Sequence, residues 1–323
     1  MLFQAYTALL GNFPSECSGL FGEEIRTDIS LWLAVDEQAF PSFLLAMQPA
    51  DMRRDIELRF VGVQFSRECS ITLSNGQSST GTFTIIKLEE NDPDLVRVFL
   101  RLLEEAFCGE DVPRTNRAVA ECILELADLF RQIENSSKDL IGLWGELLII
   151  AEAHSPEAAA RCWCLHKNSK YDFVCDAFVL EVKTTLKASR EHSFALEQLR
   201  PSGALAVFVA SIRLTEAHGG RAVSELVNDI LDRLGDPDLR KAFLGLCMIK
   251  GGADLYKSSM KLQPLSRTAG IAYFAADDIP VPELSVGAPI SNVRFDVCLD
   301  AVSELDGDDR TRLMNLSIQP SDG

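Results

Sequence analysis

Three charged residues in "YDFVCDAFVLEVKTT" (residues 171–185) have the types and spacing that metal chemistry requires. Asp172 lies near the start of one short apolar run, and Glu181 and Lys183 lie two residues apart in the next. Because side chains alternate along a β-strand, Glu181 and Lys183 share one face of their strand. A turn around 177–180 would pair the two strands and bring Asp172 beside Glu181. We therefore expect two carboxylates and one ammonium group at the edge of a sheet.

This set of groups suits the hydrolysis of a phosphodiester. Two carboxylates offer the hard oxygen ligands that Mg²⁺ prefers, and we expect Mn²⁺ to substitute for it. A metal ion held there would stabilise charge on phosphate oxygens, and Lys183 would orient or deprotonate the attacking water. The alternative interpretation is a solvated strand face, on which Glu181 and Lys183 form an ion pair.

A further carboxylate, Glu146, lies in the middle of a helix predicted over 135–153, whose other central residues are apolar or glycine. A buried carboxylate is costly unless it is paired or bound to a metal. Gly142 and Gly145 flank its face and would permit the close approach of another backbone. This context favours a role for Glu146 at the same site as Asp172.

The pattern of Asp172 followed by Glu181-Val182-Lys183 resembles the Asp…(Asp/Glu)-x-Lys signature of the PD-(D/E)XK nuclease superfamily, which includes many restriction endonucleases. The segments "WGELL", "YDF", "EVKTT" and "HSFALEQL" together look like a bacterial family of PD-(D/E)XK proteins often found in restriction-modification gene clusters. The similarity covers residues 138–200 well. One departure is the residue before Asp172, which is tyrosine where the superfamily signature has proline.

The resemblance implies roles for five residues. Asp172 and Glu181 would hold the metal with help from Glu146, and Lys183 would serve the attacking water. Gln198, on the helix after the lysine strand, matches a place where several branches of the superfamily have a Gln that assists the site or touches DNA. A polar residue on an amphipathic helix is the alternative for Gln198.

Charge bears on how nucleic acid would bind. The chain has a formal charge of −17, which counts against a free-standing DNA-binding protein. Residues 159–200, however, carry seven Lys and Arg against five acids, a net charge of +2. We therefore predict that phosphates are contacted by Lys187, Arg190 and Arg200. The alternative is that these side chains only solvate the surface. We expect weak duplex binding by the chain alone. Productive binding would need a second copy or a restriction-system partner such as a helicase-like ATPase or a methyltransferase.

Patterns along the chain predict an α/β fold, a restriction-endonuclease-like mixed sheet flanked by helices, with a β-rich N-terminal domain and an α+β C-terminal region. Predicted strands are 57–66, 69–74, 82–90, 161–166, 171–178, 180–186, 204–214, 269–275 and 292–300, and predicted helices are 92–107, 117–133, 135–153, 193–199, 222–234 and 237–249. The predicted domains are 1–112, a nuclease-like core over 113–216, and 217–323.

Composition places this chain among cytoplasmic proteins without a membrane span. Its nine cysteines are scattered and odd in number, which is typical of reduced thiols, and no signal peptide or membrane-length apolar run is visible. The leading hypothesis is a metal-dependent DNA endonuclease of a restriction or anti-phage defence system. Two alternatives are a nuclease acting on RNA or branched nucleic acid, and a catalytically silent subunit that assembles with partner proteins.

Overall fold

A computed structural model describes the chain in two compact units, Met1–Ser136 and Ser137–Gly323. The residues that the structure does not describe are 16, 47–52, 59–60, 110–111, 136–138, 165–169, 201–204, 253, 267–269, 284–290, 308–309, 312 and 314–323. None of the helices in the described part of the chain is long and apolar enough to cross a membrane.

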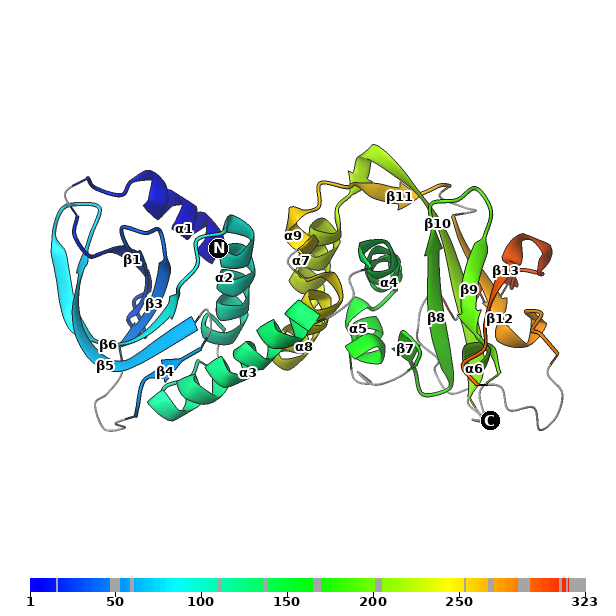
Figure 1. Cartoon of the computed structure of the whole chain (residues 1–323), viewed down its shortest axis with the longest axis horizontal. Coiled ribbons are helices and arrows are strands. Elements are labelled where there is room, and N and C mark those ends of the chain that lie inside the picture. The colour runs from blue at the N-terminus through cyan, green and yellow to red at the C-terminus, as the bar shows by residue number, and fades with distance from the viewer. Residues whose placement is uncertain are drawn as a thin grey trace. The chain divides into compact units, whose positions relative to one another are not determined.

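The first unit is a sheet that closes on itself, accompanied by helices (Figure 1). Its strands are β1 (Leu20–Arg26), β2 (Leu31–Val35), β3 (Pro41–Ala46), β4 (Ile56–Glu57), β5 (Val61–Thr72) and β6 (Ser78–Leu88), in the order β1-β2-β3-β6-β5-β4. A parallel pairing of β1 with β5 closes the ring. The helices are α1 (Leu2–Gly11), α2 (Pro93–Phe107) and α3 (Asn116–Asn135). The predicted helices 92–107 and 117–133 are thus confirmed.

One long strand, β5, replaces the two strands predicted over 57–66 and 69–74. Its register with β6 shifts between Gln64 and Arg67, and Ser66 has a positive φ of 51°. A β-bulge therefore absorbs the break in the apolar alternation that looked like a strand end in the sequence.

The second unit is built on a mixed sheet. Its strands are β7 (Phe173–Val174), β8 (Phe178–Thr185), β10 (Ala206–Arg221), β11 (Leu262–Pro264) and β12 (Ile271–Ala275). β8 and β10 are parallel, whereas β7 pairs with β8, and β11 and β12 pair with β10, in antiparallel fashion. The connection from β8 to β10 contains β9 (Glu191–Ala195), which pairs with β13 (Arg294–Cys298), and the short helix α6 (Leu196–Leu199). The mixed α/β architecture predicted from the sequence is compatible with this arrangement.

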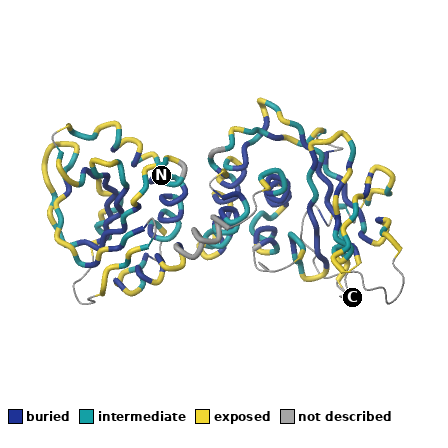
Figure 2. Tube along the Cα trace, in the orientation of Figure 1, coloured by how far each residue is buried: buried dark blue, intermediate teal, exposed yellow. Residues whose placement is uncertain are grey.

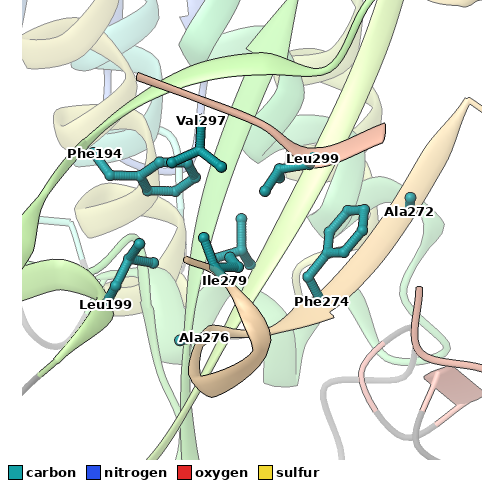
Figure 3. Packing of buried hydrophobic residues seen from close by; sticks show 9 residues of the cluster. Phe194, Leu199, Ala272, Phe274, Ala276, Ile279, Val297 and Leu299 are labelled. Carbon is teal, nitrogen blue, oxygen red and sulfur yellow. The ribbon is translucent and has the colours of Figure 1, made fainter. Parts of the chain in front are cut away.

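Different layers cover the two faces of this sheet. One face is covered by α4 (Leu140–Glu152), with α5 (Pro156–Cys164), α7 (Val223–Arg233) and α8 (Pro237–Gly251) packed around it, and α9 (Asp254–Lys257) follows α8 (Figure 1). On the other face, apolar residues of α6, β9, β12 and β13 form a buried cluster that includes Phe194, Leu199, Phe274 and Val297 (Figure 3). The central strands and α4 are the most continuously buried elements of this unit (Figure 2).

Two predicted elements of this unit are wrong. The predicted strand 161–166 is helical up to residue 164, and its last two residues lie outside the described part of the chain. Ser155 accepts a hydrogen bond from the N–H of Ala158, and Pro156 occupies the first helical position, so a helix start outweighs the strand-like alternation of cysteines. The predicted helix 193–199 is strand β9 as far as Ala195, and only its last turn is helical.

The three predicted domains do not coincide with the two units. The helix Asn116–Asn135, placed in the predicted core, belongs to the first unit. Strands β11 and β12, placed in the predicted C-terminal region, complete the sheet of the predicted core by pairing with β10. Because the sheet needs these strands, 113–216 does not form a separate core.

Gly145 sets how closely α4 approaches the sheet. A Cβ atom at this position would lie 2.0 Å from Cγ2 of Thr184 on β8 and 3.4 Å from Cδ1 of Ile212 on β10. Gly142 has a different role from the close approach predicted for it, because its N–H donates to Oδ1 of Asp139, the N-cap residue of α4.

We expect Gly145→Ala to destabilise the second unit, because the added methyl group collides with a side chain of a central strand. The loss in the free energy of unfolding should be about 1–3 kcal/mol, as in other overpacked cores. Urea unfolding followed by tryptophan fluorescence measures it. The matched control is Gly219→Ala in the same unit, where a Cβ meets nothing within 4 Å. Equal stability of the two variants would contradict the close packing.

Candidate active site

Asp172 and the β7–β8 hairpin form the first part of the site. Asp172 immediately precedes β7, and its Oδ2 accepts a hydrogen bond of 2.8 Å from the backbone N–H of Val182 on β8. This bond joins the aspartate to the strand that carries Glu181 and Lys183. The structure therefore brings Asp172 beside Glu181, as the spacing in the sequence predicted.

Glu181 is buried, and one of its oxygens has two partners while the other has none. Oε1 accepts a hydrogen bond of 2.6 Å from Nε2 of Gln198 and forms an ion pair of 2.8 Å with Nζ of Lys183. Oε2 is buried and has no hydrogen-bond partner. An unsatisfied buried carboxylate oxygen costs free energy, and a bound cation would remove that cost.

Gln198 is fixed by the start of α6. Its Oε1 accepts a hydrogen bond of 2.9 Å from the N–H of Ala195, which leaves the amide nitrogen directed at Glu181. The hydroxyl of Tyr171 donates to the carbonyl of Gln198 at 3.2 Å, so the residue before Asp172 also holds α6 in place. The structure thus places Gln198 at the site rather than on a solvated helix face.

Glu146 enters the site from α4 and is accompanied by two residues that the sequence analysis missed. Its Oε2 accepts hydrogen bonds from Nε1 of Trp163 (2.6 Å) and from Nζ of Lys250 (2.5 Å). Nζ of Lys250 also lies 3.4 Å from Oδ1 of Asp172. Lys250 therefore joins the helix carboxylate to the hairpin carboxylate.

A signal for Lys250 exists in the sequence, although it is weak. Lys250 lies seven residues after Phe243 and three after Cys247, and both of these are fully buried positions of α8. A lysine on the buried stripe of an amphipathic helix indicates a charged partner inside the protein. The partner itself cannot be identified from helical spacing.

Burial dominates the protonation behaviour of the acids. It raises the pKa of Glu146 to about 8 and that of Glu181 to about 7, and the charge of Asp172 adds to both increases. Lys250 and Trp163 oppose the increase at Glu146, and Lys183 opposes it at Glu181. For Lys250, burial alone would lower the pKa, but attraction to Glu146 and Asp172 raises it.

Of the three predicted phosphate contacts, Lys187 is the most exposed. Its side chain is 62% exposed and pairs with Glu191 at 3.4 Å. Arg190 is 2% exposed, and its guanidinium donates to the carbonyl and hydroxyl oxygens of Ser211 on β10. The prediction for Arg190 is therefore wrong, because this arginine supports the sheet from inside.

Arg200 is also used structurally. Its guanidinium donates to the carbonyl oxygens of Leu199, Ala276, Asp277 and Ile279. These bonds hold the turn after β12 against α6, and so a phosphate would have to replace several carbonyl partners. The geometry does not favour the predicted DNA contact.

The donor set fits a metal ion on two carboxylates rather than three. In the part of the chain that the structure describes, no three His, Cys, Asp or Glu side chains are arranged to hold a metal ion. The reason at this site is Lys250, whose ammonium group lies between Glu146 and Asp172. Asp172 and Glu181 remain, and the unpartnered Oε2 of Glu181 is a ligand atom of the kind that Mg²⁺ accepts.

A mixed sheet with this Asp, a Glu-x-Lys strand and a glutamate on the preceding helix is the arrangement of a PD-(D/E)XK protein. The model of a family described as "Putative PD-(D/E)XK family member, (DUF4420)" matches residues 21–300. The chain belongs to this family, and the superfamily predicted from the sequence is confirmed. No curated protein and no solved structure matches the chain significantly.

The raised pKa of Glu146 predicts how stability depends on pH. Folding favours the protonated acid, so the metal-free protein should lose stability as pH rises from the ordinary pKa of 4.5 towards about 8. Glu146→Gln cannot ionise, and its free energy of unfolding should fall less over this range. Urea unfolding in EDTA at several pH values measures the difference.

The matched control for this prediction is Glu216→Gln, which removes an exposed carboxylate of β10. Its stability should follow that of the wild type at every pH. Parallel pH profiles for Glu146→Gln and the wild type would show that Glu146 has no raised pKa.

Proposed function

We propose that this chain is a metal-dependent endonuclease that hydrolyses phosphodiester bonds of DNA. The observation that carries the proposal is the buried, unpartnered Oε2 of Glu181. The other oxygen of this carboxylate pairs with Nζ of Lys183, and the charge of Asp172 helps to raise its pKa. Membership of a PD-(D/E)XK family supports it, because that superfamily consists mainly of nucleases.

Each residue of the site has a definite task in this reaction. Asp172 and Glu181 would hold Mg²⁺, which supplies a Lewis acid for a phosphate oxygen and acidifies a bound water. Lys183 pairs with Glu181 and lies 5.5 Å from the ring centroid of Phe194, and its ammonium group would orient the attacking water and stabilise the charge that develops there. Gln198 keeps Glu181 in the rotamer that leaves Oε2 free.

The biological setting is proposed from the resemblance to proteins of restriction-modification gene clusters. A cytoplasmic defence enzyme of this kind would act on foreign DNA together with a second copy or with ATPase or methyltransferase subunits. The charge of −17 supports the need for a partner, because an acidic chain repels a polyanion.

We expect Asp172→Asn and Lys183→Met to lose Mg²⁺-dependent cleavage of duplex DNA by about 100-fold or more, in line with the loss of a catalytic group. Asparagine is preferable to alanine at position 172, because an amide oxygen can still accept the N–H of Val182. The measurement is the rate of plasmid nicking with Mg²⁺, with Mn²⁺ and with EDTA.

The matched control is Lys261→Met, which removes an exposed lysine that pairs with Glu225 away from the site. It should cleave like the wild type. If the wild type leaves DNA intact but cleaves RNA or branched substrates, the proposed chemistry stands and only the proposed substrate is wrong. If it cleaves none of them with either metal at protein concentrations above the Kd for duplex DNA, the silent-subunit hypothesis replaces the proposal.

Purified chain should bind duplex DNA only weakly at physiological salt. We expect a Kd of about 1 µM or weaker, the range of nonspecific binding. Lys187→Glu should weaken binding further, because Lys187 is the exposed cation nearest in sequence to Lys183. A fluorescence anisotropy titration measures this, with Lys261→Glu as the control. Nanomolar affinity without a partner would contradict the proposed need for one.

A further inference from the structure

Lys250 places a positive charge between two carboxylates of the candidate site. Its ammonium group contacts carboxylates from two separate elements, Oε2 of Glu146 on α4 and Oδ1 of Asp172 before β7. A second metal ion, as in two-metal sites, would need carboxylate ligands of this kind. Here a side chain of the protein itself makes both contacts.

The surroundings hold Lys250 in this place. Nζ lies 5.6 Å from the centroid of the Trp163 ring, and the indole N–H of Trp163 donates to the same oxygen of Glu146. Phe243 of α8 packs on Trp163 with ring centroids 5.5 Å apart. Lys250 is thus one part of a packed group and not a side chain free in solvent.

The next residue, Gly251, brings this end of α8 close to α4. A Cβ at Gly251 would lie 2.9 Å from Cδ1 of Leu255 and 3.1 Å from Cδ2 of Leu143 on α4. The close approach shortens the path that the lysine side chain must span to reach Glu146. The close packing of α8 on α4 therefore helps to place the ammonium group of Lys250 at the site.

The charge balance favours a single divalent ion. Three carboxylates (Asp172, Glu181 and Glu146) face two ammonium groups (Lys183 and Lys250). With all three carboxylates ionised, one divalent ion would change the formal charge of the site from −1 to +1, which suits a phosphate. A second would raise it to +3 at a largely buried site, where repulsion between like charges is strong.

We propose that Lys250 takes the place of a second metal ion, so that the chain binds one divalent ion, on Asp172 and Glu181. The inference rests on the proposed function because it concerns the same metal site. Glu146 is then a partner of Lys250 and not a ligand of the ion. Lys250 is a positioning residue that holds Glu146 and neutralises Asp172.

The test is the number of Mn²⁺ ions bound per chain, measured by electron paramagnetic resonance titration without DNA. The wild type and Lys250→Arg should each bind one ion, and Asp172→Asn should lose it. Lys250→Met should bind a second ion at millimolar Mn²⁺, because Glu146 and Asp172 are then free to hold it. The double variant Lys250→Met/Glu146→Gln should return to one ion. Lys261→Met is the control and should bind one.

The outcomes separate this inference from the proposed function. Two Mn²⁺ ions bound to the wild type would overturn the inference, whether or not Lys250→Met folds. A folded Lys250→Met that binds a single ion with unchanged affinity would overturn it as well. Either result is compatible with Mg²⁺-dependent cleavage by the wild type. A wild type that binds no Mn²⁺ and cleaves no nucleic acid overturns both.

Discussion

The gathering of three carboxylates, two of them buried, at one sheet edge is the constraint around which the second unit is built. Glu146 and Glu181 are 7% and 5% exposed, and Asp172 lies close enough to raise the pKa of both. Such a cluster is stable only if every charge is compensated. The compensation comes from Lys183, Gln198, Trp163, Lys250 and the N–H of Val182, which belong to four different elements. The contacts that compensate the carboxylates therefore also hold these four elements together.

The packing of α4 on the sheet follows from the same constraint. Glu146 reaches the edge of the sheet only because its neighbour Gly145 lets the helix approach Thr184. On the opposite face, the apolar cluster around Phe194 and Leu199 anchors β9 and α6 (Figure 3). That cluster fixes Gln198 one residue away from Leu199. Small and apolar residues with no chemistry of their own thus determine where the acidic and amide groups lie.

The sequence predicted those parts of the site that depend on local geometry. A spacing of two residues places Glu181 and Lys183 on one strand face, and a short hairpin brings Asp172 to them. It missed Lys250, which contacts Glu146 across a separation of 104 residues, because no periodicity encodes such a contact. The prediction for Arg190 was wrong, because residue type alone does not show whether a side chain turns inward. The closure of the sheet in the first unit could not be predicted from the sequence either. A parallel pairing such as that of β1 with β5 joins strands that are far apart in the chain, and no local pattern gives their register.

The contacts of Glu181 and Asp172 within the protein hold both carboxylates in place. Lys183 and Gln198 occupy one oxygen of this carboxylate, and Val182 occupies one oxygen of Asp172. The remaining buried oxygen of Glu181 is left without a partner, at a cost of about 1–3 kcal/mol to the folded state. A ligand that satisfies this oxygen recovers that free energy without moving the side chains that hold it. The cost left at Oε2 would therefore add to the affinity for a cation such as the proposed Mg²⁺.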